Sequence, residues 1–180
     1  RPDDLNRQIV MRHEALGGLR AESAVKTLSA FNPNVEIEAV PENFSEENAA
    51  TLVAKADIVF SCAPLFEERF LMNRECVRQG KPLIDCAMFS MEGRVIPIVP
   101  GEKPCLTCLY PELPPHWKRR FPVIGAVSAL IGQIGVLEGI KILTDVGVAN
   151  LGKMTLVDAG TMYLRKIGLA RVPGCGVCGG

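Results

Sequence analysis

The sequence predicts an α/β fold with a Rossmann-like, mostly parallel sheet, crossover helices, an antiparallel C-terminal extension and a zinc staple made by four cysteines. Patterns typical of helices and strands alternate as far as Cys86, which indicates parallel strands joined by helices. After Ala87 the strand patterns follow one another directly, which favours antiparallel pairing. Two Cys-x-x-Cys pairs, far apart in the chain, supply the staple.

Four segments have the apolar spacing or the boundary residues of helices. In the first, Leu19, Val25 and Leu28 share one face. Ser45 is the expected N-cap of the second helix, and Gly80 ends the third. The predicted helices cover residues 17–31, 45–54, 66–78 and 122–145.

Six further segments have the patterns of strands. Residues 35–40 alternate between apolar and polar side chains, whereas residues 57–62 and 82–87 are compact apolar runs. The remaining predicted strands are residues 94–99 and a last hairpin of 153–158 with 162–169. A nucleotide-binding sheet usually opens with a strand, a glycine-rich turn and a helix, and no such opening is visible here.

The four cysteines Cys105, Cys108, Cys175 and Cys178 form the two Cys-x-x-Cys pairs. A tetrahedral zinc takes four thiolates, and each pair can supply two of them from one tight turn. Disulfides or a redox-active pair are the alternatives, but two such pairs together favour zinc. With all four positions filled, this zinc is structural and not catalytic, and it fixes the C-terminal tail to the middle of the chain.

The composition limits the class of protein. The chain has 180 residues, enough for one domain with its own core, and its 20 basic and 20 acidic residues give a net charge of zero. Nothing in this balance indicates binding to nucleic acid or to a membrane surface. The cysteine count is odd, and Cys62, Cys76 and Cys86 have no obvious partners in the sequence. This pattern favours a reducing compartment, the cytoplasm, over a secreted disulfide framework.

One apolar stretch, residues 121–143, resembles a membrane span. Gln133, Glu138 and Lys141 interrupt the apolar stretch, and its several glycines lower its hydrophobicity. A spanning helix rarely carries such charges without a functional reason. We therefore expect a buried helix or a homodimer interface here.

Several segments resemble one family closely. They are Asp4-Leu-Asn-Arg-Gln8, Gly17 to Ala24, Asn32-Pro33, Met91-Glu-Gly93, the two cysteine pairs and Leu137 to Lys141. Together they resemble the ThiF/MoeB/HesA proteins, the bacterial relatives of ubiquitin-activating enzymes, in order over essentially the whole chain. The resemblance implies a single adenylation domain over residues 1–180. Arg1 would follow the second strand of that fold, so the family's glycine loop and ribose-binding acidic residue would lie upstream.

The resemblance also implies an activity and a site. Such proteins bind MgATP and adenylate a carboxylate, usually the C-terminal Gly-Gly of a ubiquitin-like sulfur-carrier protein. Arg7 matches the family's phosphate-contacting arginine, with Asn6 and Gln8 as polar ligands on either side. Arg20 stands where the family has its catalytic lysine. Asp4 and Leu65 complete the nucleotide-binding positions.

Three departures from the family pattern bear on this mechanism. Arginine at position 20 is planar and bulkier than lysine, so the exchange is not conservative. Pro64 occupies the place of an aspartate that positions Mg²⁺, and it offers no carboxylate unless Glu67 or Glu68 substitutes for it. The loop of residues 114–121 has Lys118 near the position of a thioester-forming cysteine, so a covalent step there is not expected.

The other residues of note in this region are interpreted as structural. His13 and His116 have no Ser, Cys or carboxylate arranged around them in the sequence. Trp117 is a candidate partner anchor, and the run from Lys118 to Arg120 is a solvated loop.

Two further classes of function compete with adenylation. Pro64 and Arg20 together are compatible with a pseudo-enzyme that keeps the fold for binding or dimerisation. A dinucleotide-dependent oxidoreductase is the third reading, and the zinc staple and Arg7 segment argue against it. An intact upstream glycine loop would favour ATP use over the pseudo-enzyme.

Overall fold

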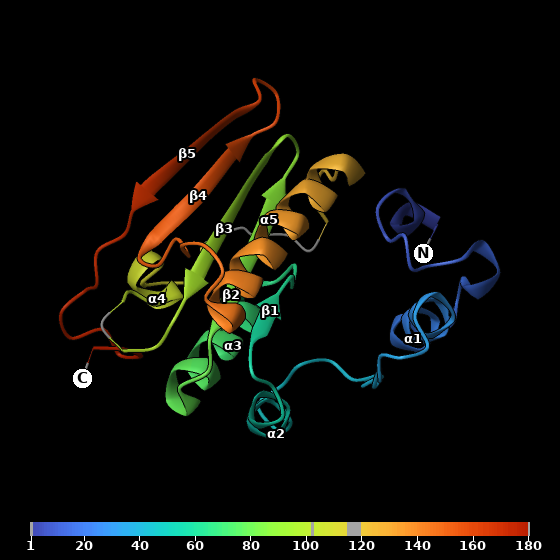
Figure 1. Cartoon of the computed structure of the whole chain (residues 1–180), viewed down its shortest axis with the longest axis horizontal. Helices are drawn as coiled ribbons and strands as arrows, with labels where there is room; N and C mark the ends of the chain where they lie inside the picture. The colour runs from blue at the N-terminus through green and yellow to red at the C-terminus, as the bar shows by residue number, and fades with distance from the viewer. Residues whose placement is uncertain (1, 102, 115–119, 180) are drawn as a thin grey trace. The chain divides into compact units, whose positions relative to one another are not determined.

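The computed structural model describes residues 2–101, 103–114 and 120–179, and it divides the chain into two compact units. One unit comprises Arg1–Asn43 with Ile124–Ala126, and the other comprises Phe44–Val123 with Val127–Gly180. The helices and strands are shown in Figure 1.

The first unit is built from short helical segments. It contains the 3-10 helices η1 (Pro2–Asn6) and η2 (His13–Ala15) and the helix α1 (Arg20–Phe31). Thr27 Oγ1 donates a hydrogen bond to the carbonyl oxygen of Val10 at 3.0 Å, which ties the connecting segment to α1. α1 begins at Arg20 and not at Gly17, because Gly17 has a φ of 90°, which a helix cannot accommodate.

The second unit contains a five-stranded sheet in the order β1-β2-β3-β4-β5. The strands are β1 (Val59–Ser61), β2 (Leu83–Phe89), β3 (Glu92–Ile98), β4 (Lys153–Asp158) and β5 (Tyr163–Gly168). Its helices are α2 (Ala49–Ala54), α3 (Phe66–Gln79), α4 (Leu106–Leu109) and most of α5 (Gly125–Thr144). The α/β class and the antiparallel extension are confirmed.

The expectation of a mostly parallel sheet is wrong for the residues described. β1 and β2 are parallel, but the pairs β2–β3, β3–β4 and β4–β5 are all antiparallel. The predicted strand over residues 35–40 does not form; that segment has no regular structure, and its residues are exposed or half-buried. An alternating pattern makes a strand only where another strand pairs with it.

The second predicted helix also differs from the prediction. α2 begins at Ala49, and Asn48 is its N-cap residue. Ser45 is not the cap: its backbone N–H donates to Asn48 Oδ1 at 2.9 Å, so residues 45–48 form a turn before the helix. Gly80 ends α3 as predicted, in the left-handed conformation.

Each face of the sheet carries its own core. On one face α5 packs Val127 and Ile131 against the sheet, where Ile84, Val95 and Val157 are buried. The opposite face is covered by α2, α3 and α4, and its buried residues include Val53, Cys76, Leu83, Ile96, Ile98 and Leu106. The candidate metal centre belongs to this second core.

The glycines of α5 let the helix lie close to the sheet. A Cβ atom on Gly135 would come within 2.4 Å of Cys86 Sγ, and one on Gly139 would come within 2.4 Å of the Phe60 ring. One face of this helix is therefore buried against the sheet, while Leu137, Ile140 and Leu143 remain exposed. The expected homodimer interface is left as a proposal.

Among the helices of the described residues, α5 is long and apolar enough to cross a membrane, which alone is weak support for a membrane role. Its Glu138 is buried, pairs with Lys141 and accepts hydrogen bonds from Asn150 N at 2.8 Å and Asn150 Nδ2 at 2.6 Å. This arrangement satisfies the charged group within the second unit.

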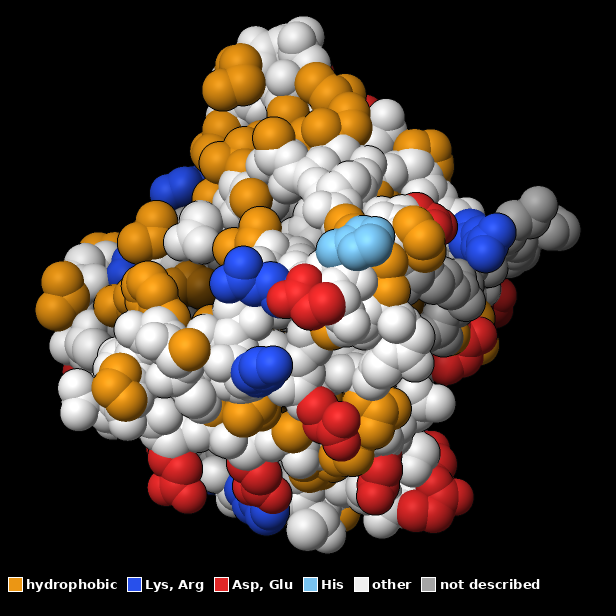
Figure 2. Space-filling view, turned by 90° about the vertical axis from the view of Figure 1, so that its right-hand side faces the viewer, with side chains coloured by type: hydrophobic (Ala, Val, Ile, Leu, Met, Phe, Trp, Pro, Cys, Tyr) orange, Lys and Arg blue, Asp and Glu red, His pale blue; other side chains and the backbone are white. Residues whose placement is uncertain are grey.

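Charged side chains of both signs are distributed over the surface. On the face drawn in Figure 2, Lys and Arg side chains are interspersed with acidic and apolar ones. This mixture agrees with the zero net charge of the sequence.

Candidate functional site

The four cysteines of the two Cys-x-x-Cys pairs come together in the second unit. Their sulfur atoms all lie within 4.8 Å of one another. Cys105 Sγ is 3.8 Å from Cys175 Sγ, and Cys108 Sγ is 3.4 Å from Cys178 Sγ. A tetrahedral zinc with Zn–S bonds of about 2.3 Å places its sulfurs roughly 3.8 Å apart. The cluster therefore fits a metal bound by four thiolates.

Local backbone structure gives each pair its tight turn. Cys108 N donates to the carbonyl oxygen of Cys105 at 3.1 Å, and Gly179 N donates to that of Cys175 at 2.8 Å. Gly179 must be glycine, because a Cβ atom there would lie 2.2 Å from the backbone nitrogen of Cys175. Gly174 has a φ of 71°, which also favours glycine.

A buried asparagine holds the first cysteine pair in place. Asn73 Oδ1 accepts a hydrogen bond from Leu106 N at 2.9 Å, and Asn73 Nδ2 donates to Thr107 Oγ1 at 3.3 Å. Val172 N donates to Cys108 Sγ at 3.4 Å, from the segment that leads to the second pair. Sequence reasoning missed Asn73, although a buried amide within the apolar pattern of a helix was a usable signal.

The thiols differ in acidity before any metal binds. Burial raises the pKa of Cys175, but the backbone N–H groups of Cys178 and Val177 and the neighbouring thiols outweigh it and lower that pKa to about 7. Burial and the thiols of Cys108 and Cys105 raise the pKa of Cys178 to about 12. A divalent metal would remove this difference, since it binds all four groups as thiolates.

The second candidate site lies in the first unit, where η1 presents Arg7. The Arg7 guanidinium donates to Asp4 Oδ1 at 2.9 Å, to Asn6 Oδ1 at 2.9 Å and to the carbonyl oxygen of Asp3 at 3.0 Å. Burial acts to raise the pKa of Asp4, whereas the charges of Arg7 and Arg20 act to lower it. The sequence-predicted residues Asp4, Asn6, Arg7 and Arg20 are thus brought together.

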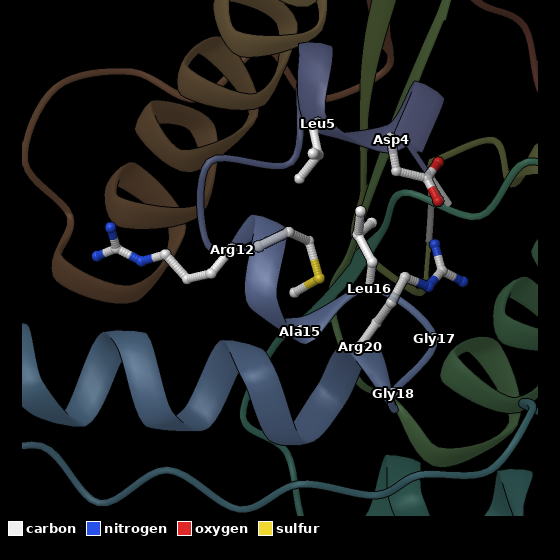
Figure 3. Close-up of a pocket in the computed structure, with 9 residues that line it drawn as sticks. Asp4, Leu5, Arg12, Ala15, Leu16, Gly17, Gly18 and Arg20 are labelled. Atoms are coloured by element: carbon white, nitrogen blue, oxygen red, sulfur yellow. The ribbon is translucent and has the colours of Figure 1, made fainter.

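A small hollow adjoins these residues, as Figure 3 shows. It is lined by Asp4, Leu5, Met11, Arg12, Ala15, Leu16, Gly17, Gly18 and Arg20. In Figure 3 the Asp4 carboxylate and the Arg20 guanidinium lie on the same side, and Arg12 points to the opposite side. Leu19, the N-cap of α1, makes no side-chain cap, so the first N–H groups of α1 remain available to an anion.

The other sequence-predicted residues have the following positions. Gln8 follows η1, and its backbone N–H donates to the carbonyl oxygen of Asp4 at 2.9 Å. Leu65 is the N-cap of α3 in the second unit; Pro64 precedes it, and Glu67 and Glu68 follow in the first turn. His116, Trp117, Lys118 and Arg119 lie outside the described residues, whereas His13 and Arg120 are exposed.

These features define an α/β protein with four cysteines that could hold a metal ion in one unit and a cluster of Asp4, Arg7 and Arg20 in the other. The chain belongs to the ThiF family, which matches residues 1–177.

Two curated relatives are similar to this chain over nearly its whole length. It is 40% identical over 179 residues to "Protein HesA" of Leptolyngbya boryana, covering 99% of this chain and 65% of that protein. It is 34% identical over 185 residues to "Sulfur carrier protein adenylyltransferase" of Thermus thermophilus, covering 98% of this chain and 68% of that protein. The chain thus spans about two thirds of these relatives.

Among solved structures, the fold resembles that of MccB from E. coli determined with ATP. The TM-score is 0.82 at 20% identity, and the match covers 99% of this chain and 56% of that chain. At this identity the likeness shows the fold alone.

Proposed function

We propose that the chain is part of an enzyme that adenylates a carboxylate with MgATP and releases pyrophosphate. Membership of the ThiF family and the similarity to a sulfur carrier protein adenylyltransferase support this reaction class. The observation that carries the proposal is the grouping of Asp4 and Arg7 with Arg20 at the start of α1. In this proposal residues 1–180 act as one adenylation domain.

The two arginines would stabilise the charge that develops on the phosphates. A carboxylate oxygen attacks the α-phosphorus, the bond to the bridging oxygen of the β-phosphate breaks, and pyrophosphate leaves with the electron pair. Arg20 is exposed at the helix start, and Arg7 offers a fork of N–H donors suited to phosphate oxygens. Asp4 orients Arg7 through their ion pair, and Asn6 and Gln8 add polar ligands.

Nucleotide binding would also involve the start of α3. We propose that Leu65 contacts the nucleotide there and that Glu67 or Glu68 takes the part of a Mg²⁺ ligand. Pro64 has no carboxylate for this purpose. When bound, Mg²⁺ would neutralise part of the phosphate charge.

The four-cysteine cluster is proposed to hold structural zinc. Its ligands are all provided by the chain, and zinc in such closed sites stabilises the fold without taking part in chemistry. The four cysteines must stay reduced to bind a metal, and this requirement favours a cytoplasmic protein.

The proposed substrate is the C-terminal tail of a ubiquitin-like sulfur-carrier protein or a small acid. The relative from Thermus thermophilus supports a sulfur carrier by its name. We further propose a homodimer through α5, where Leu137, Ile140 and Leu143 remain 60%, 47% and 54% exposed. Sedimentation of a monomer at micromolar concentration would remove the dimer proposal.

A second candidate function is a pseudo-enzyme of the same fold. Pro64 favours it, because the metal-positioning carboxylate expected from the family is missing at that place. Such a protein would bind a carrier tail or an active relative without using ATP.

Calorimetric titration of MgATP into the full-length protein, with pyrophosphate exchange as the activity assay, separates the two functions. R7A and R20A are expected to lower exchange by about 100-fold or more, because each removes a charge that stabilises the transition state. R165A, on exposed β5, is the matched control and is expected to behave as wild type. Full-length protein that neither binds MgATP nor exchanges pyrophosphate would overturn the adenylation proposal and support the pseudo-enzyme.

A further inference from the structure

A half-buried arginine in the second unit has no role in the proposed chemistry. Arg94 lies on β3, opposite Ala87 of β2, and on the sheet face that α3 and α4 cover. Its guanidinium carbon is 5.0 Å from the centre of the Tyr110 ring and 5.9 Å from that of the Phe66 ring. Phe66 is 4% exposed and Tyr110 is partly exposed, so of the two aromatic rings beside Arg94 the Tyr110 ring lies nearer to solvent.

One edge of this guanidinium is unused. Arg94 Nε and Nη2 are both buried, and neither has a hydrogen-bond partner among the residues that the structure describes. These two atoms form the side of a guanidinium that holds a carboxylate with two parallel hydrogen bonds. Buried donors without partners are costly, so such an edge indicates a missing acceptor.

A neighbouring arginine shows what that edge binds in this environment. Arg69 Nε donates to Asp85 Oδ1 at 2.9 Å, and Arg69 Nη2 donates to Asp85 Oδ2. Arg69 lies 5.1 Å from the centre of the same Phe66 ring. Both oxygens of Asp85 are therefore occupied by Arg69, and Arg94 has the same edge without a carboxylate.

The charges of this cluster do not cancel. Two guanidiniums, Arg69 and Arg94, lie near one buried carboxylate, Asp85, which pairs with Arg69. Burial lowers the pKa of Arg94 and the charge of Arg69 lowers it further, whereas Tyr110 and Asp85 act in the opposite direction. Arg94 nevertheless stays charged at neutral pH, because arginine does not deprotonate in proteins. A second carboxylate would offset the excess positive charge.

We propose that Arg94 is a carboxylate-binding residue whose Nε and Nη2 atoms hold a carboxylate of the substrate between the Phe66 and Tyr110 rings. The planar fork and flat aromatic walls suit a planar carboxylate, as the Arg69–Asp85 pair illustrates. Tyr110, the more exposed of the two rings, marks the side from which a carboxylate would approach. The assignment of this carboxylate to the substrate rests on the proposed adenylation; the carboxylate site itself does not.

The test uses full-length protein with ¹⁵N-labelled arginine and no nucleotide. Sodium acetate is titrated against sodium chloride at matched ionic strength, while the side-chain Nε–H signals are followed by NMR. R94K removes and so assigns the Arg94 signal. We expect acetate, and not chloride, to move the Arg94 signal saturably towards that of Arg69. The Arg69 signal, already paired, and the exposed Arg165 signal should not move.

A second readout keeps the proposal falsifiable. Acetate is expected to raise the thermal unfolding midpoint of wild type but not that of R94K, since a ligand stabilises only the protein that binds it. Lysine keeps the charge and most of the stem but lacks the two-point edge. An unmoved Arg94 signal, or equal stabilisation of R94K, would overturn the proposal. Neither readout needs ATP, so failure of the adenylation proposal remains distinguishable.

Discussion

The two units of this protein differ in how they are held together. The second unit buries apolar side chains on both faces of the sheet, and it brings the sulfur atoms of four cysteines together in one cluster. None of residues 2–43 is buried, and their 3-10 turns and helix are joined by polar contacts such as Thr27 to Val10. Stability is thus concentrated in the second unit, while the first carries cations that a ligand can reach.

The largest effect should follow from breaking the cysteine cluster. C175S removes one of four metal ligands, and because structural zinc contributes about 10 kcal/mol in small domains, the unfolding free energy should fall by several kcal/mol. Elemental analysis and thermal unfolding measure both consequences. C62S, at an exposed cysteine outside the cluster, should keep a full metal equivalent. Metal content near one equivalent in C175S would contradict the four-thiolate centre.

A smaller loss is expected where α5 meets the sheet. G135A places a Cβ atom 2.4 Å from the buried Cys86 Sγ, so the variant should lose about 1–3 kcal/mol through overpacking. G132A is the matched control in the same helix, where nothing lies within 4 Å. It should gain about 0.4–1 kcal/mol, because alanine restricts the unfolded chain. Denaturant unfolding distinguishes them, and equal stabilities would show that the close approach is relieved without cost.

A comparable change in the first unit should hardly affect global stability. T27V removes the hydrogen bond to Val10, worth about 1 kcal/mol locally. Hydrogen exchange should become faster around residues 8–16, while the thermal midpoint of the sheet-containing unit stays near that of wild type. A cooperative loss of stability across both units would disprove the comparison.

The smallest effect concerns reactivity and leaves stability unchanged. Interaction with the Cys86 thiol lowers the pKa of Cys62 to about 7, although the charge of Asp85 acts to raise it. The Cys62 alkylation rate should therefore rise with pH up to about 7 and level off above it, as thiolate formation completes. In C86S the plateau should move to higher pH, towards the ordinary thiol value. Mass spectrometry of iodoacetamide labelling measures the rate, and an unchanged profile in C86S would exclude the thiol pair as the cause.

Most of the second unit was predictable from local patterns. Gly80 ends α3 as its conformational freedom predicts, and the alternation of β4 and β5 gave a hairpin close to the observed one. The segment of residues 35–40 has an equally good strand pattern, but none of the strands that the structure describes pairs with it. Whether a strand forms depends on a neighbouring strand that can pair with it, and the local sequence pattern does not give this information.

Residue types and short spacings were enough to predict the α/β class, the two cysteine pairs and the polar segment from Asp4 to Gln8. The tertiary structure was needed to show that β4 pairs with β3, that Asn73 anchors the cysteine turn and that Asp85 pairs with Arg69 and not with Arg94. These are contacts between residues far apart in the chain, and burial makes their hydrogen bonding and charge balance matter. A spacing along the sequence cannot specify which of two arginines receives the one carboxylate.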